Sequence, residues 1–274
     1  MRKLLAVSGG IDSVVMLHLF RADKEAIVVH FDHGIRESSA EDCAFVERLA
    51  KEYGLRFCSR RMELGETCSE EKARSSRYAF FESLRESPED KIYTAHHQND
   101  LLESAVINLL RGTGWRGLAP LRNSHIERPL LSWTKADIYR YATEHNLHFR
   151  LDQTNNEDKY LRNRVRKKLA ELPETKKQEL LKLCVRQREI AAEIDNIIES
   201  NAPHGPQFSR EFFRELPDDL ALEFLRHCLD VHLTRPQLER VLDAIRTFLP
   251  GKRFSLDKKH FLKMQKYYFV TEKH

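Results

Sequence analysis

The residues best suited to chemistry stand in one short turn near the start of the chain. Its sequence is Ser8-Gly9-Gly10-Ile11-Asp12-Ser13. Two adjacent glycines permit a positive φ, and a helix that begins here offers unpaired N–H groups to a phosphate. The two serine hydroxyls can donate hydrogen bonds, and the carboxylate of Asp12 can hold Mg²⁺ beside a phosphate. We therefore expect these six residues, Ile11 included, to bind a nucleotide.

Further polar side chains follow other apolar runs. An Asp32–His33 pair ends the run Ala26–Asp32 and could bond a ribose or base, or could simply be the exit of a strand. In the next helical segment Arg74 and Arg77 share a face, where they suit either phosphate oxygens or ion pairs with nearby glutamates.

Two carboxylates open a later helical segment. Asp100 and Glu103 lie in the first turn of the expected helix Asn99–Arg111. Acidic groups are favoured there in any helix, because they complement the positive end of the dipole. A second interpretation is that such a carboxylate receives the ammonium group of a substrate.

The elements that must position these groups alternate between strands and helices. The expected strands are Lys3–Val7, Ala26–Asp32, Leu55–Met62, Lys91–Ala95 and His125–Leu130. Between them come helical patterns at Ser13–Ala22, Ser38–Tyr53, Ser69–Arg85, Asn99–Arg111 and Thr134–His145, the last with Thr134 as its N-cap. Such alternation predicts an α/β fold with a doubly wound parallel sheet. Ligands bind such sheets at the carboxyl ends of the strands, where the strand order reverses.

The second half of the chain has a different pattern. A charged helical stretch runs from Arg162 to Ser200 with a break at Pro173, and Asn201–Pro206 has the composition of a loop. Helices at Asp218–Leu229 and Arg235–Leu249 and strands near Phe254–Leu256 and Tyr267–Val270 predict a small α+β domain. We expect a catalytic domain with a helical extension at 1–190 and a small basic domain at 205–274.

Positive charge is concentrated in two blocks. Residues 159–189 hold 11 Lys and Arg against 4 Asp and Glu, and residues 235–274 hold 10 against 4. Such blocks suggest a polyanionic partner, although solvated helix faces would look alike. The candidate phosphate contacts are Arg162, Arg164, Arg166, Lys167 and Lys168. Tyr267 and Tyr268 could stack on a base, but packing in a small core is the favoured interpretation.

Composition excludes several classes of protein. No apolar run reaches the roughly 20 residues that span a bilayer, and the first apolar run stops at Ser8. The five cysteines are scattered without a CxxC pair, which argues against a zinc ribbon or an iron–sulfur cluster. We expect a cytoplasmic protein with reduced thiols and no membrane partner.

The turn SGGIDS between a strand and a helix resembles the signature of the PP-loop superfamily of ATP pyrophosphatases. Taken in order, further blocks make the chain similar to the tRNA(Ile)-lysidine synthetase family: HFDHGIR, EEKARSSRY, TAHHQND with LLES, RGTGWRGL, RPLL, DQTNN and RNRVR. They cover about residues 1–168. The second half matches only loosely, and its short tail leads us to expect that a further domain of longer relatives is absent.

The resemblance implies a ligase that uses ATP and Mg²⁺. Such enzymes adenylate the C2 oxygen of the wobble cytidine in the isoleucine tRNA with anticodon CAU. Free L-lysine then displaces AMP and leaves lysidine. The basic domain would bind the tRNA, and the enzyme would act as a monomer or a homodimer.

The resemblance also assigns roles by position. Ser8, Gly9, Gly10, Asp12 and Ser13 would bind ATP with Mg²⁺ on Asp12, and His33 would lie beside the nucleotide. Catalytic charge stabilisation on phosphate would come from Arg74 with Arg164 or Arg166. Asp100 would hold the incoming lysine with help from Glu103. Where many relatives have two adjacent aspartates this chain has Asn99-Asp100, so one carboxylate is missing. Substrate contacts are expected from Arg77, Arg162 and Arg166.

Three alternatives remain open from the sequence. A thiolating tRNA modifier of the same superfamily would usually need cysteine pairs that this chain lacks. A small-molecule amide synthetase would need no RNA and no basic blocks. An RNA-binding protein without chemistry would not need the intact turn with Asp12.

Overall fold

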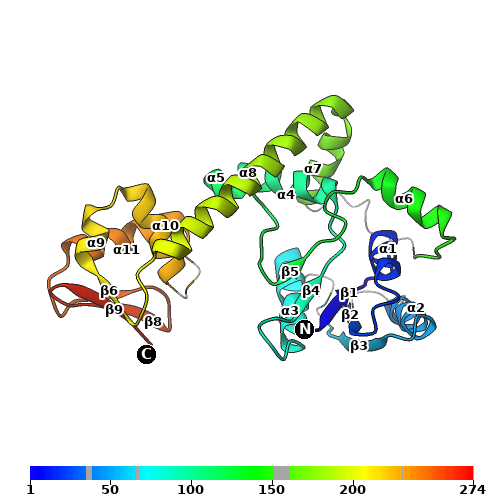
Figure 1. Cartoon of the computed structure of the whole chain (residues 1–274), viewed down its shortest axis with the longest axis horizontal. Coiled ribbons are helices and arrows are strands. Elements are labelled where there is room, and N and C mark those ends of the chain that lie inside the picture. The colour runs from blue at the N-terminus through cyan, green and yellow to red at the C-terminus, as the bar shows by residue number, and fades with distance from the viewer. Residues whose placement is uncertain are drawn as a thin grey trace. The chain divides into compact units, whose positions relative to one another are not determined.

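The computed structural model describes residues 1–34, 39–63, 65, 68–150, 161–229, 231 and 233–273. The chain divides into two compact units, Met1–Arg188 and Glu189–His274. The division falls inside one long helix, α8 (Glu174–Asn201), so the helix supplies residues to both units. Each unit has its own hydrophobic core. Figure 1 labels the helices and strands of both units.

The first unit is built on a parallel sheet. Among the described residues five strands pair in the order β3-β2-β1-β4-β5. Every pairing in it is parallel, with Leu5 of β1 opposite Val28 of β2 and Tyr93 of β4. The strands are β1 (Lys3–Ala6), β2 (Ala26–Asp32), β3 (Arg56–Arg61), β4 (Lys91–Tyr93) and β5 (Ile126–Glu127). The predicted doubly wound fold is confirmed.

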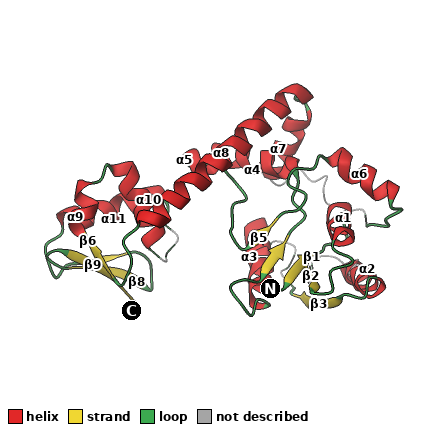
Figure 2. Cartoon of the chain, viewed as in Figure 1, coloured by secondary structure: helices red, strands yellow, loops and turns green. Residues whose placement is uncertain are grey.

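Helices cover both faces of this sheet, because successive residues of a strand point to opposite sides. Leu5 and Val28 pack in one cluster with residues of α1, α2 and α6, whereas Leu4 and Val29 pack on the other face with Phe80 and Phe81 of α3. Figure 2 shows these helices around the strands. The helices of this unit before α8 are α1 (Ile11–Leu19), α2 (Ser39–Glu52), α3 (Glu70–Ser83), α4 (Gln98–Leu110), α5 (Gly114–Gly117), α6 (Lys135–Glu144) and α7 (Leu161–Ala170).

Local capping fixes where the helices near the strand ends begin. Thr134 caps α6 in a reciprocal capping box, in which its hydroxyl accepts from the Asp137 N–H and the Asp137 carboxylate accepts from Thr134. His97 and Asp100 form the equivalent box at α4. Each box satisfies backbone N–H groups that have no partner inside the helix. The predicted N-cap at Thr134 is confirmed.

The second unit packs helices, the C-terminal part of α8 among them, against an antiparallel sheet with the order β6-β9-β8-β7. Its elements are β6 (Gln207–Ser209), α9 (Arg210–Glu215), α10 (Asp218–Cys228), α11 (Arg235–Thr247), β7 (Arg253–Ser255), β8 (His260–Met264) and β9 (Tyr268–Lys273). Phe213, Leu225 and Phe269 lie in its core. The predicted small α+β region is therefore present.

Several details of this unit differ from the expectation. We predicted no element at β6, α9 or β8, which are three, six and five residues long and depend on their partners for stability. The expectation that Tyr267 packs in the core is wrong, since the residue is 68% exposed and Phe269 occupies that place. No described helix is both long and apolar enough to cross a membrane.

Candidate active site

The strand order places two polar segments side by side. From β1 the chain proceeds outward to β2 and β3 and then returns to the other side of β1 as β4, so the order reverses between β1 and β4. The turn Ser8–Ser13 leaves the carboxyl end of β1, and the segment His96–Asp100 follows β4. A ligand crevice is expected at such a reversal.

The turn itself is held by one hydroxyl group. Ser13 Oγ accepts from the N–H groups of Ser8 (3.2 Å) and Gly9 (3.1 Å) and donates to the Gly10 carbonyl (2.8 Å). Gly9 has a φ of +94°, and a Cβ there would meet Phe45 and Val46 at 3.5 Å. Ser13 is buried, so its first role is to shape the turn.

The geometry of the turn fits a phosphate. Gly10 is the N-cap of α1 and supplies no side-chain cap to the first-turn amides, including those of Ile11 and Asp12. A Cβ on Gly10 would meet only Ser8 Oγ, at 3.7 Å, within 4 Å. Uncapped amides at a helix N-terminus, approached across open space, form an anion site.

The structure adds a residue that the sequence analysis missed. Lys135, in the first turn of α6, donates from Nζ to Asp12 Oδ1 over 2.6 Å. Both side chains are about one-third exposed, at 35% and 32%. The turn contains no lysine of its own, and the fold brings one to it from 123 positions along the chain. The only sequence signal would have been the position of Lys135 directly after a capping threonine.

A single imidazole lies between the two acidic groups of the predicted site. His97 Nε2 is 3.9 Å from Asp12 Oδ1 and 3.6 Å from Asp100 Oδ2. The His97 N–H donates to the same Asp100 oxygen over 2.9 Å. Burial favours the neutral form of Asp100, but His97 and this backbone N–H outweigh it and hold the pKa of Asp100 below its usual value. The predicted metal carboxylate and the predicted lysine carboxylate are thus neighbours.

Glu103 lies elsewhere, in the interface between α4 and α7. Its side chain is only 3% exposed, and it accepts from Arg166 Nε at 2.8 Å and Nη2 at 3.2 Å. Arg162 approaches the same carboxylate at 3.6 Å and donates to Ser104 Oγ. Arg164 is exposed and lies two residues from each of these arginines, so it points away from α4. The structure thus unites Glu103, Arg162 and Arg166 and leaves Arg164 apart.

The remaining predicted residues lie at the ends of β2 and on α3. His33 packs edge-on against Phe31, and its Nδ1 is buried without a partner among the described residues. Burial and the charge of Arg77 lower the pKa of His33 to about 4. Arg74 and Arg77 both stack on Tyr78, with guanidinium-to-ring distances of 4.9 and 5.8 Å. Two predicted blocks, Ile35-Arg36 and Asp152–Asn155, fall outside the described residues.

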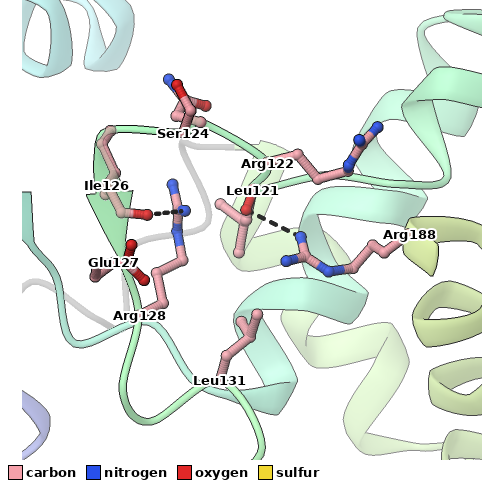
Figure 3. Close-up of a pocket in the computed structure, with 9 residues that line it drawn as sticks. Leu121, Arg122, Ser124, Ile126, Glu127, Arg128, Leu131 and Arg188 are labelled. Atoms are coloured by element: carbon pink, nitrogen blue, oxygen red, sulfur yellow. Dashed lines mark hydrogen bonds between the residues drawn. The ribbon is translucent and has the colours of Figure 1, made fainter. Parts of the chain in front are cut away.

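Two cavities lined by described residues lie away from the turn. One of about 310 Å³ borders β5 and is lined by three arginines, Arg122, Arg128 and Arg188 (Figure 3). The other, of about 260 Å³, lies between α2 and the ends of β2 and β3. The turn lies at the sheet edge, where the side chains of Asp12 and Lys135 meet.

Comparisons with known proteins identify the family of this chain. The family model of the PP-loop domain matches residues 1–173. The chain is 36% identical over 216 residues to the tRNA(Ile)-lysidine synthase of Caldanaerobacter subterraneus subsp. tengcongensis. The aligned region covers 72% of this chain and 46% of that protein. It is 31% identical to the tRNA(Ile)-lysidine synthase of Thermosipho africanus, with 93% and 64% covered.

A solved structure has the same fold at lower identity. The U34-tRNA thiolase NcsA from Methanococcus maripaludis, with its [4Fe-4S] cluster, matches with a TM-score of 0.55 and 19% identity, over 70% of this chain and 73% of that one. The chain spans between 44% and 64% of the length of the tRNA(Ile)-lysidine synthases it matches. The resemblance to these synthases is confirmed, and the chain belongs to the PP-loop domain family.

Proposed function

We propose that this protein ligates free L-lysine to C2 of the wobble cytidine of the isoleucine tRNA with anticodon CAU, at the expense of ATP. The family match over residues 1–173 supports the use of ATP. The relatives named tRNA(Ile)-lysidine synthase, which are 31–38% identical to this chain, support the RNA substrate and the product.

One observation carries the proposal. His97 Nε2 lies within 3.9 Å of Asp12 and within 3.6 Å of Asp100, so the phosphate turn and the second carboxylate are neighbours. A reaction in two steps needs this adjacency. The group that makes the adenylate and the group that delivers the amine must act on the same base.

Each residue then has a chemical task. The turn Ser8–Ser13 and Lys135 would bind the phosphates, and Asp12 would hold Mg²⁺, which neutralises charge on those phosphates. The C2 oxygen of cytosine forms a bond to the α-phosphorus of ATP while diphosphate leaves. The lysine ε-amine then bonds to C2, and AMP leaves with the oxygen.

Asp100 would orient the incoming amine. A carboxylate whose pKa is held below its usual value stays charged at neutral pH and attracts an ammonium group. The ε-amine has an ordinary pKa of about 10.4, so it must lose a proton before it attacks. His33 is held neutral beside β2 and would contact the nucleotide through its unpartnered Nδ1.

The two predicted domains would divide the work. We propose that the region around 1–190 performs the chemistry and that the region 205–274 contributes to tRNA binding. Tyr267 supports the second part, because its ring is 68% exposed with Lys266 stacked over it at 4.9 Å. An exposed aromatic ring beside a cation can stack on an unpaired base.

The test is direct transfer of label. The purified chain is incubated with ATP, Mg²⁺, labelled lysine and the CAU-anticodon tRNA, and radioactivity in the RNA is counted. Wild type and a Glu52→Gln control, which changes an exposed carboxylate on α2, should both incorporate lysine. Asp12→Ala should abolish both diphosphate release and transfer.

A second variant separates the two steps. Asp100→Asn keeps a hydrogen-bond acceptor for the cap of α4 but removes the charge, so it should raise the KM for lysine while diphosphate release continues. Sulfur incorporation instead of lysine would favour a thiolase. Diphosphate release that needs no RNA would favour a small-molecule synthetase. Either result would refute the proposal.

A further inference from the structure

Four arginines that are far apart in the sequence lie near one another in the first unit. Arg122, Arg128 and Arg188 line the cavity of about 310 Å³ beside β5, and Leu131 and Ile126 form part of its wall (Figure 3). Arg74, on α3, is close enough for its charge to act on Arg128. Glu127 is the one acidic residue in the described lining of this cavity.

Backbone carbonyls hold two of these arginines in place. Arg188 donates from Nη1 to the carbonyls of Pro120 and Leu121, the latter over 2.9 Å. Leu121 has a φ of +59°, a conformation that bulky residues seldom adopt and that presents its carbonyl to Arg188. Arg128 donates from Nη1 to the Ile126 carbonyl over 3.0 Å.

Arg128 and Arg188 differ from Arg210, whose three guanidinium nitrogens all donate within the protein. Arg210 is 2% exposed and places Nε, Nη1 and Nη2 on three different carbonyls, at 2.7, 2.9 and 2.7 Å. Arg128 has a buried Nε without a partner among the described residues. The described contacts of Arg188 use Nη1 alone. Both therefore keep donors for a ligand.

The charges around the cavity are imbalanced. Burial, and then repulsion from Arg188 and Arg74, lower the pKa of Arg128 to about 10, which still leaves it charged at neutral pH. Burial and the charge of Arg122 also lower the pKa of Arg188. Like charges held together at this density are stabilised by a bound anion. Arg74 also acts on His96, so the group extends toward the candidate active site.

We propose that Arg128 and Arg188, flanked by Arg74 and Arg122, bind phosphate groups of the substrate RNA backbone outside the active site. The proposal rests on the proposed function, since it takes an RNA as the substrate. It joins Arg188, from the basic block 159–189, to Arg128, which lies outside both basic blocks of the sequence. The proposal also assigns a smaller part of RNA binding to α7, because Arg162 and Arg166 already contact Glu103.

Salt dependence of tRNA binding tests this surface. The full chain is titrated onto labelled tRNA by fluorescence anisotropy at a series of KCl concentrations. Each lost phosphate contact lowers the slope of log affinity against log salt by about 1. Arg128→Gln and Arg188→Gln should each lower the slope by about 1, and the double variant by about 2. Arg128→Lys should keep most of the slope because it keeps the charge.

Two controls make the result decisive. Arg48→Gln removes the same charge from an exposed position on α2 and should leave the slope unchanged. Thermal melts of every variant detect misfolding, and Arg128→Lys keeps the test valid if Arg128→Gln does not fold. Inorganic phosphate, added in place of KCl at equal ionic strength, should not compete more strongly with wild type than with Arg128→Gln.

The outcomes distinguish a failure of this inference from a failure of the proposed function. If wild type transfers lysine but Arg128→Gln and Arg188→Gln keep the wild-type slope, the inference is overturned and the proposed function stands. Selective competition by inorganic phosphate would overturn it in favour of a free-anion site. If wild type binds no tRNA, the proposed function fails and this inference fails with it.

Discussion

Two ion pairs of the first unit have nearly equal N–O distances, but their carboxylates differ in exposure to solvent. Lys135 Nζ lies 2.6 Å from Asp12, and Arg166 Nε lies 2.8 Å from Glu103. The Asp12 side chain is 32% exposed, whereas that of Glu103 is 3% exposed. A solvated pair is worth little and can exchange partners, whereas a buried carboxylate cannot lose its partner without a large penalty.

This difference in exposure indicates different roles for Asp12 and Glu103. Asp12 can release Lys135 to take a metal ion, so it remains a candidate for nucleotide chemistry. Both Glu103 oxygens already accept hydrogen bonds from Arg166, and they join α4 to α7. We therefore assign Glu103 to positioning α7 rather than to contact with lysine. The following variants test that assignment.

The largest effect is expected at the exposed pair. Asp12→Ala should reduce ATP-dependent diphosphate release on the order of 10²- to 10³-fold, because it removes the metal-binding charge beside the phosphates. The unfolding free energy should change by less than about 1 kcal/mol, since the pair is solvated. Radiometric assay of diphosphate and urea denaturation measure the two quantities. A fully active Asp12→Ala protein would contradict a role of Asp12 in nucleotide chemistry.

The buried pair should behave in the opposite way. Glu103→Ala should lower the unfolding free energy by about 1–2 kcal/mol, because two hydrogen bonds between α4 and α7 are lost while the Arg166 side chain, which is 43% exposed, can still be hydrated. Glu103→Gln should lose less, since an amide oxygen can still accept one hydrogen bond. Urea denaturation of both variants checks this. If Glu103→Ala is as stable as wild type but has a raised KM for lysine, Glu103 belongs to the substrate site after all.

A smaller effect is expected at the partner of Asp12. Lys135→Ala should raise the KM for ATP roughly 10-fold, because a charge-assisted contact at the phosphate site is lost. Lys135→Arg should restore part of the affinity. Steady-state kinetics at varied ATP measures both, with Arg140→Gln on the exposed side of α6 as the control. Tighter ATP binding by Lys135→Ala would instead indicate that Lys135 competes with the metal ion for Asp12.

The smallest effect is expected at His33, because its burial favours the neutral imidazole. Its pKa in the folded chain is about 4, below the unfolded value of about 6.5. The unfolded chain therefore binds a proton first as the pH falls, so stability falls between about pH 6.5 and pH 4. His33→Gln should flatten this dependence by on the order of 1 kcal/mol, measured by urea denaturation across that range. The same dependence in the variant, or its loss in the exposed-residue control His148→Gln, would exclude His33 as the cause.

Local patterns in the sequence predicted the scaffold of the site. The alternation of apolar runs and helical spacing set β1, α1 and β4 to within a few residues of the structure. Thr134 was recognisable as an N-cap because capping depends on residues three positions apart. The short elements β6 and α9 were not recognisable, since they form against partners from distant parts of the chain, and β8 has only five residues between its neighbours β7 and β9.

The sequence by itself determined that a glycine turn with Asp12 follows a buried strand and opens a helix, because neighbouring residues fix backbone conformation. Only the tertiary structure decided which charges meet. Lys135 reaches Asp12 across 123 residues, and Arg128 and Arg188 line one cavity although they are far apart in the sequence. An ion pair depends on which faces of distant elements come into contact, and residue type alone does not specify that.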